Sequence, residues 1–324
     1  YWLTDENGDA LPYLDEIEFR VIPDSQVRRQ ALESGDVDMM ASSDTQVVNE
    51  VGEDDNFATL RQGGDTNYIL MHLTKPGLDD TSERCALWQG LDIPSLLEVT
   101  TAGYGNQANA PFSEGQEGFL ADNGAPPFDP DAAAAAIEEW EAANGPLTIN
   151  YSTTPTATNL TTAQFIQQAW GAIGVDVNID QIEQSKLINN ALFGDPAFDV
   201  FGWRNHDGIF VDSQYFWWHS SAASPDGELA LNFGRLADGE IDSLLEQARG
   251  EADPDARRAL AEDVNRRFAS ECFIVPTSWT QWGVSSYPYI QNIGRTPIPD
   301  TDRFMRDGAG FAGQVWLTAV FTGE

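Results

Sequence analysis

The sequence of 324 residues is poor in positive charge, and lysine in particular is almost absent. Only Lys75 and Lys186 occur, and the 17 Lys and Arg residues face 52 Asp and Glu residues, which gives a formal net charge of −35 at pH 7. The composition corresponds to a pI near 4.1. Phosphate binding needs clustered Lys and Arg side chains, so the composition argues against nucleic acids and anionic membrane surfaces as partners.

The acidic residues are spread along the whole chain rather than gathered in a tail. A carboxylate-rich surface with few lysines is typical of adaptation to high salt, because concentrated salt screens the repulsion between like charges. We therefore expect a halophilic protein, and the alternative is an acidic protein of ordinary salinity. Either interpretation concerns the environment of the protein rather than its activity.

Cysteine and long apolar segments are also scarce. Cys85 and Cys272 are the two cysteines, and they form no CxxC or other metal-binding spacing. One long-range disulfide and two unpaired cysteines both fit the sequence, and the unpaired state is at least as well supported. No apolar segment reaches the eighteen or so residues that span a bilayer, and neither a signal peptide nor an initiator Met is present. We expect a fragment or a processed product.

The sequence also lacks the motifs of common catalytic sites. It has no GxSxG, P-loop, GxGxxG or HExxH motif, and its three histidines, His72, His206 and His219, have no metal-binding spacing. With 52 acidic residues, a pair of carboxylates proves nothing about glycoside hydrolysis. We therefore expect a binding protein without a metal or other cofactor.

The pattern of segments predicts an α/β protein of two lobes, since 324 residues exceed the usual size of one hydrophobic core. Helices are expected from Asp129 and Asp253, because in each case an N-cap aspartate precedes proline at the first helical position. Between them, short strands alternate with helices over residues 147–203, which predicts crossover helices over a largely parallel sheet.

The two ends of the chain are expected to share one lobe. Residues 17–22, "IEFRVI", have the composition of a strand, and Ser42 and Ser43 are expected N-caps of a following helix. Residues 313–321 are expected to form a final strand that joins the sheet of the opening segment. The predicted division is 1–67 in lobe I, 68–281 in lobe II and 282–324 returning to lobe I.

Several segments resemble a known family when they are taken in order and spacing. They are "YW", "LPYLDEIEFRVI", "RRQALESGDVD", "RCALWQGLDIPSLL", "TTAQFIQQAWGAIGVDVNI", "FDVFGW" and "DARRALAEDVNRRF" followed by "CFIVPTSW". The chain resembles, over essentially its whole length, the extracytoplasmic solute-binding proteins of ABC transporters, family 5. This family includes the oligopeptide-, dipeptide- and nickel-binding proteins.

The resemblance implies a two-lobe, type II periplasmic-binding-protein-like fold that holds a ligand between its lobes. The family normally has a substantial segment before the Tyr-Trp pair, so the first lobe is expected to be incomplete. The implied function is the capture of a small peptide or similar polar solute and its delivery to a membrane permease. We expect a monomer that is located in the periplasm or at the cell surface. A lipid anchor in the full-length protein is compatible with this location.

The candidate ligand residues lie mainly in the segment 198–220, "FDVFGWRNHDGIFVDSQYFWWHS". In the family that the chain resembles, an aspartate at about this point commonly meets a ligand amine. The matching position here is His206 or Asp207, and Asp212 is a further candidate. Arg204 could bind a ligand carboxylate through both arms of its guanidinium, although a salt bridge to a neighbouring acid is slightly favoured. The aromatic candidates for the walls of the pocket are Trp203, Trp217, Trp279 and Trp282, each with core packing as the alternative.

Three successive aromatic residues, Phe216, Trp217 and Trp218, cannot all face the same way on a helix or a strand.

Two other functions stay open at this point. One is a secreted carbohydrate-active or metal-dependent hydrolase that uses the acidic loop. The other is the binding of nickel or a nickel chelate through His206 or His219.

Overall fold

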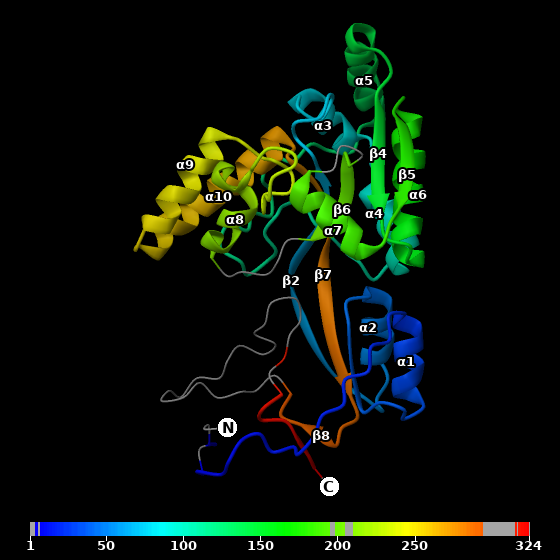
Figure 1. The fold of residues 1–324 in the computed structure, drawn as a ribbon, viewed down its shortest axis with the longest axis vertical. Helices are drawn as coiled ribbons and strands as arrows, with labels where there is room; N and C mark the ends of the chain where they lie inside the picture. The colour runs from blue at the N-terminus through cyan, green and yellow to red at the C-terminus, as the bar shows by residue number, and fades with distance from the viewer. Residues whose placement is uncertain are drawn as a thin grey trace. The chain divides into compact units, whose positions relative to one another are not determined.

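The computed structural model describes residues 4–5, 7–194, 198–204, 210–293, 315 and 317–323 (Figure 1). The chain divides into two compact units, Tyr1–Gly63 with Thr280–Glu324, and Gly64–Trp279. Both points of division fall within long strands, β2 (Ala58–Met71) and β7 (Ile274–Ser286). Helices and strands alternate along the chain, which confirms the predicted α/β class.

The smaller unit contains α1 (Ser25–Glu33), β1 (Met39–Ser42) and α2 (Thr45–Gly52). Strand β1 pairs antiparallel with the end of β7, and Leu32, Met40, Val47 and Val51 form the buried core. Aspartates cap both helices, because Asp24 accepts a hydrogen bond from the backbone N–H of Val27 and Asp44 accepts one from Val47. The expected caps Ser42 and Ser43 were therefore wrong by one or two positions.

The strand predicted at residues 17–22 is not formed. Phe19 is 77% exposed and Val21 is 92% exposed, so these apolar side chains do not pack into a hydrophobic core. A strand needs a neighbour for its backbone groups as well as a suitable composition, and none of the described strands pairs with this segment.

The final strand predicted at residues 313–321 was wrong for most of its described residues, and residues 313, 314 and 316 lie outside the described part of the chain. Of the described residues near the C-terminus, only β9 (Phe321–Thr322) is a strand, and it pairs with β8 (Ile290–Gln291) in a separate two-stranded sheet. The expected union with the sheet of the opening segment is therefore not observed.

The larger unit is built on a sheet in the order β7-β2-β6-β4-β5, with the short β3 (Asn106–Gln107) on β7. Strands β4 (Thr148–Thr153), β5 (Asp176–Gln181) and β6 (Val200–Arg204) are mutually parallel. They are connected by the crossover helices α6 (Ala157–Ala172) and α7 (Gln184–Phe193). This confirms the predicted unit of alternating strands and helices, and β2 adds an antiparallel neighbour beside β6.

Helices cover both faces of this sheet (Figure 1). Because side chains alternate along a strand, Ile69 and Met71 of β2 enter one core, and Tyr68 and Leu70 enter the other. The first core is completed by α3 (Thr81–Gln89), α4 (Ile93–Thr101), α5 (Pro130–Asn144) and α6. The second is completed by α7, α8 (Tyr215–Trp218), α9 (Gly239–Gly250) and α10 (Pro254–Glu271).

Helices α5 and α10 begin as predicted, with Asp129 and Asp253 accepting hydrogen bonds from backbone N–H groups of their first turns. No helix in the described part of the chain combines the length and apolar character that crossing a bilayer requires.

Candidate functional site

The site begins at the end of β6, where Trp203 and Arg204 face opposite sides of the sheet. Trp203 lies across from Tyr68 of β2 and packs edge-on against Phe201 and Phe233, with ring centroids 5.7 and 5.3 Å apart. Its indole is half-buried and belongs to the second core. The structure therefore places Trp203 in an aromatic cluster at the edge of the sheet.

Arg204 lies on the other face of β6, in register with Asn67 of β2. Burial lowers the pKa of its guanidinium, and the nearby carboxylate of Asp65, which is only 1% exposed, opposes this shift. Arg204 keeps its positive charge at any physiological pH. This end of the sheet therefore carries a half-buried cation near a buried carboxylate.

The two candidates for recognition of a ligand amine, His206 and Asp207, lie outside the described residues. The chain is described again from Phe210, and the 3₁₀ turn Val211–Gln214 leads into α8. Asp212 forms an ion pair with Arg249 of α9, whose guanidinium lies 3.6 Å from the ring centroid of Tyr215. The structure therefore gives Asp212 a partner within the protein.

The three successive aromatic residues point in different directions, as predicted. Phe216 is 57% exposed, whereas Trp218 is buried and packs against Phe112 and Phe268 with centroids 5.6 and 4.5 Å apart. Trp217 is half-buried, and its ring lies edge-on to Phe233 at 5.6 Å.

A small cavity of about 30 Å³ lies beside these aromatic residues. Its walls are almost entirely apolar and include Tyr68, Leu70, Trp203, Trp217, Trp218 and Phe233. The polar side chain in the wall, Asn232, already bonds to the backbone of His219 and Leu236. A space of this size holds a few water molecules at most, so it is too small for a peptide.

Trp279 and Trp282 lie on β7, but the two residues belong to different compact units. Trp279 is opposite Asn106 of β3 and has Phe119 edge-on at 5.8 Å. Its indole N–H is buried and has no hydrogen-bond acceptor among the described residues. Trp282 is half-buried in the smaller unit.

The described histidines are engaged within the protein. The Nε2 atom of His72 lies 3.0 Å from a carboxylate oxygen of Asp226, and its Nδ1 atom lies 3.1 Å from the hydroxyl of Thr74. Nδ1 of His219 accepts a hydrogen bond from the backbone N–H of Ser221, so in the neutral ring the proton is on Nε2. A metal ligand needs a free nitrogen lone pair, so His219 is unsuited to bind a metal through Nε2. In the described part of the chain, no three His, Cys, Asp or Glu side chains form a metal site.

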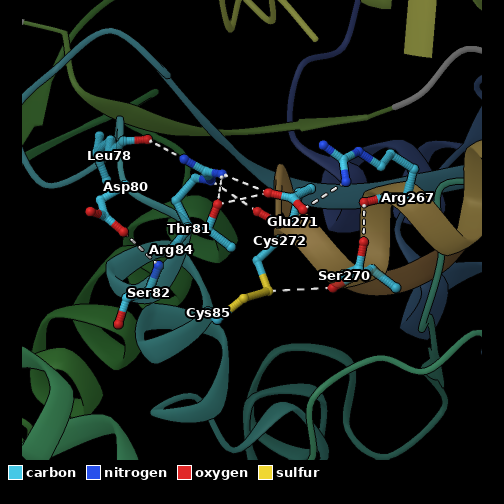
Figure 2. Close-up of a disulfide and its surroundings, with 11 residues drawn as sticks. Leu78, Asp80, Thr81, Ser82, Arg84, Cys85, Arg267, Ser270, Glu271 and Cys272 are labelled. Atoms are coloured by element: carbon cyan, nitrogen blue, oxygen red, sulfur yellow. Dashed lines mark hydrogen bonds and ion pairs between the residues drawn. A yellow bond between two sulfur atoms is a disulfide. The ribbon is translucent and has the colours of Figure 1, made fainter. Parts of the chain in front are cut away.

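Cys85 of α3 and Cys272 at the end of α10 form a disulfide (Figure 2), with a separation of 187 residues in the sequence. Of the two alternatives that the sequence left open, the structure therefore shows the long-range disulfide. Arg84 beside the disulfide donates to the backbone oxygens of Glu271 and Leu78, at 3.0 and 3.1 Å, so the end of α10 is fixed by covalent and charged contacts together.

Sequence reasoning missed the residues that hold the segment after β6. Glu117, from the long loop before α5, accepts hydrogen bonds from Arg257 of α10 and from the backbone N–H of Val211, at 2.9 and 3.3 Å. Arg257 is 140 residues from Glu117, and no local pattern in the sequence connects them.

The comparisons with known proteins agree on one family. The family model described as "Bacterial extracellular solute-binding proteins, family 5 Middle" matches residues 1–227. The oligopeptide-binding protein OppA of Mycobacterium tuberculosis (strain H37Rv) is 24% identical over 310 residues, which cover 90% of this chain and 51% of that protein. The chain thus spans about half the length of the curated relatives it matches.

Solved structures show the same fold at low sequence identity. The periplasmic binding protein DppA from Helicobacter pylori, in complex with the peptide STSA, matches with a TM-score of 0.75 and 20% identity, over 84% of this chain and 52% of that one. AgaA from A. tumefaciens R10, in complex with agropinic acid, matches with a TM-score of 0.78 and 18% identity, over 97% of this chain and 62% of that one. The chain therefore has an α/β fold like that of the type II periplasmic binding proteins.

Proposed function

We propose, on the premise that this chain belongs to the bacterial extracellular solute-binding proteins of family 5, that it captures a solute for an ABC importer. The match of the family model to residues 1–227 is the observation that carries this proposal. The family is made up of solute-binding proteins rather than enzymes, which argues against the hydrolase alternative. The partner that receives the solute is a membrane permease.

The proposed solute is a small peptide or a similar polar molecule with charged ends. Relatives named oligopeptide- and dipeptide-binding proteins support a peptide, and the complex of DppA with STSA is an example. The complex of AgaA with agropinic acid indicates that the same fold also accepts solutes other than peptides. A peptide carries an amine at one end and a carboxylate at the other, and each can form charge-assisted hydrogen bonds with the protein.

The proposed ligand residues are those of the segment after β6 and of β7. We assign the ligand amine to Asp207 or His206 and the ligand carboxylate to Arg204, whose charge is already held in a half-buried position. Asp212 is the weakest candidate, because its ion pair with Arg249 already uses its charge. The proposed apolar contacts come from the four tryptophans, Trp203, Trp217, Trp279 and Trp282. The indole N–H of Trp279, which has no acceptor among the described residues, supports a polar contact there.

The proposed location is extracytoplasmic, in the periplasm or at the cell surface. Disulfides persist in oxidising compartments, so the Cys85–Cys272 pair supports this location. We further propose a monomer adapted to high salt, with a lipid anchor as one means of attachment to the membrane.

The experiment is a calorimetric titration with the tetrapeptide STSA and with its N-acetylated form. The unchanged protein is expected to bind STSA about tenfold or more tightly than the acetylated form, because a charge-assisted bond to the amine is lost. Asp207→Ala is expected to remove this preference, and His206→Ala serves as the companion variant that decides between the two positions. Equal affinities for both peptides in the unchanged protein would refute amine recognition, and nickel added in a parallel titration tests the nickel alternative.

A further inference from the structure

Helix α10 presents a stripe of three residues, Arg257, Ala261 and Asn265, to the long loop that precedes α5. They are spaced four residues apart and therefore share one face of the helix. The backbone oxygen of Gly118 accepts a hydrogen bond from the side chain of Asn265 at 2.8 Å, and Asn265 is fully buried. The loop is thus joined to the helix at a buried point.

Gly118 explains how closely the loop approaches the helix. Its φ of +91° is in the left-handed region, and a Cβ atom at this position would lie 2.9 Å from both the Cβ and the backbone oxygen of Ala261. A residue other than glycine would meet backbone atoms that cannot move away easily. The position of Glu117, the neighbouring residue, is therefore tightly defined relative to α10.

Glu117 connects the loop and α10 to the segment that begins at Phe210. Its side chain is only 8% exposed, and one carboxylate oxygen accepts from Nε of Arg257 at 2.9 Å. The other accepts from the backbone N–H of Val211 at 3.3 Å, and the Arg257 guanidinium lies 4.8 Å from the ring centroid of Phe210. One buried ion pair therefore contacts two consecutive residues of the segment that follows position 209.

A second arginine holds the same segment from α9. Arg249 pairs with Asp212 and lies over the ring of Tyr215, which is itself stacked on His219 at 4.2 Å. Residues 210–215 are thus fixed by two helices and one loop.

Helix α10 is itself anchored at its far end. The disulfide joins Cys272 to α3, and Arg84 binds the backbone oxygen of Glu271 (Figure 2). A contact surface on a fixed helix can hold a neighbouring segment in place more precisely than a surface on a loop can.

We propose that Arg257 and Glu117 are positioning residues, which set the place of residues 210–215 and so the geometry with which the described ligand candidates of this segment, Asp212 and Trp217, meet a ligand. Arg249 and Asp212 complete this arrangement from the second helix. The part of the inference that concerns the ligand rests on the proposed function. The part that concerns the position of residues 210–215 is independent of it.

The test compares three variants by amide hydrogen exchange and by titration with STSA. Arg257→Gln removes the cation, and the double variant Glu117→Gln with Arg257→Gln removes both charges and leaves no buried carboxylate unpaired. Arg266→Gln is the matched control, because it makes the same change of charge on the same helix. Among the described residues, Arg266 forms its ion pairs with Glu262 and Asp263, both on α10.

In Arg257→Gln the amides of residues 210–215 are expected to exchange about tenfold faster, with little change in the exchange of the α10 amides. STSA is expected to bind about 3- to 30-fold more weakly, the range for residues that act without touching the ligand. The double variant is expected to show the same local change with a smaller loss of overall stability, and Arg266→Gln is expected to show neither effect.

Unchanged exchange at 210–215 would overturn the inference, as would faster exchange across the whole of α10, which indicates only a structural role. Faster local exchange with unchanged affinity for STSA would overturn the positioning role in binding. If the unchanged protein binds no STSA, the peptide function fails, whereas the exchange result still decides whether the pair positions residues 210–215.

Discussion

The disulfide offers a stringent test of how the larger unit is held together. Cys85→Ala with Cys272→Ala removes the bond and leaves both positions small and apolar. The two cysteines enclose 187 residues, which is most of the unit Gly64–Trp279. The bond therefore restricts the unfolded chain strongly, and its loss should lower the free energy of unfolding.

The size of the effect follows from the length of the closed loop. In the chain-entropy model, a loop of 187 residues corresponds to about 5 kcal/mol at 25 °C. Domains are stable by about 5–15 kcal/mol in total, so the change is a large part of the whole. With a urea m-value of about 3 kcal/mol/M, the midpoint of unfolding should fall by about 1.7 M.

The assay is urea unfolding followed by tryptophan fluorescence, with a second double variant as the control. Cys272 has a φ of +51°, in the left-handed region that glycine accepts without strain. Cys85→Ala with Cys272→Gly should therefore recover about 1 kcal/mol relative to the alanine pair. A midpoint within about 0.3 M of the unchanged protein would refute the reasoning, since it would mean that the bond contributes little to stability.

Two further predictions concern pH and salt. His72 is fully buried, and burial lowers its pKa in the folded protein. The unfolded chain therefore binds a proton at His72 more readily than the folded protein does. The free energy of unfolding should fall as the pH drops below about 6.5, which is the usual pKa of a free histidine side chain. His72→Gln should show less of this loss between about pH 7.5 and about pH 5.5 in urea unfolding, and an identical loss in both proteins would contradict the assignment. With a net charge of −35, the urea midpoint should rise between about 0.2 M and about 2 M KCl as repulsion is screened, and a midpoint that is independent of salt would count against adaptation to high salt.

The sequence predicted the middle of the fold well, because its helices start at local signals. Asp129 before Pro130 and Asp253 before Pro254 supply the caps that begin α5 and α10. The connections between the short strands are long enough for helical crossovers, which favours a parallel sheet. Local chemistry was sufficient for these elements.

The failures share a physical cause, which is dependence on distant partners. The segment 17–22 has the composition of a strand, but its exposed Phe19 and Val21 show that it has no neighbour to pair with. The disulfide joins residues 187 positions apart, and Glu117 meets Arg257 across 140 positions. No local pattern records such contacts, so neither the disulfide nor the ion pair beside Val211 was predictable.

The candidate site was predicted as a region, and its role in binding stays a prediction. The order of segments identified the end of β6, and the structure then separated Trp203, which lies in an aromatic cluster, from Arg204, which lies beside Asp65. The partner of Asp212 was not foreseen, because Arg249 is on a helix that follows 37 residues later.

The most direct test of the central claim is a calorimetric titration of the purified protein with STSA. The proposed function predicts saturable binding of one peptide per chain, weakened about tenfold or more by acetylation of the peptide amine. No saturable binding of STSA, or equal affinity for the free and acetylated peptides, would contradict it.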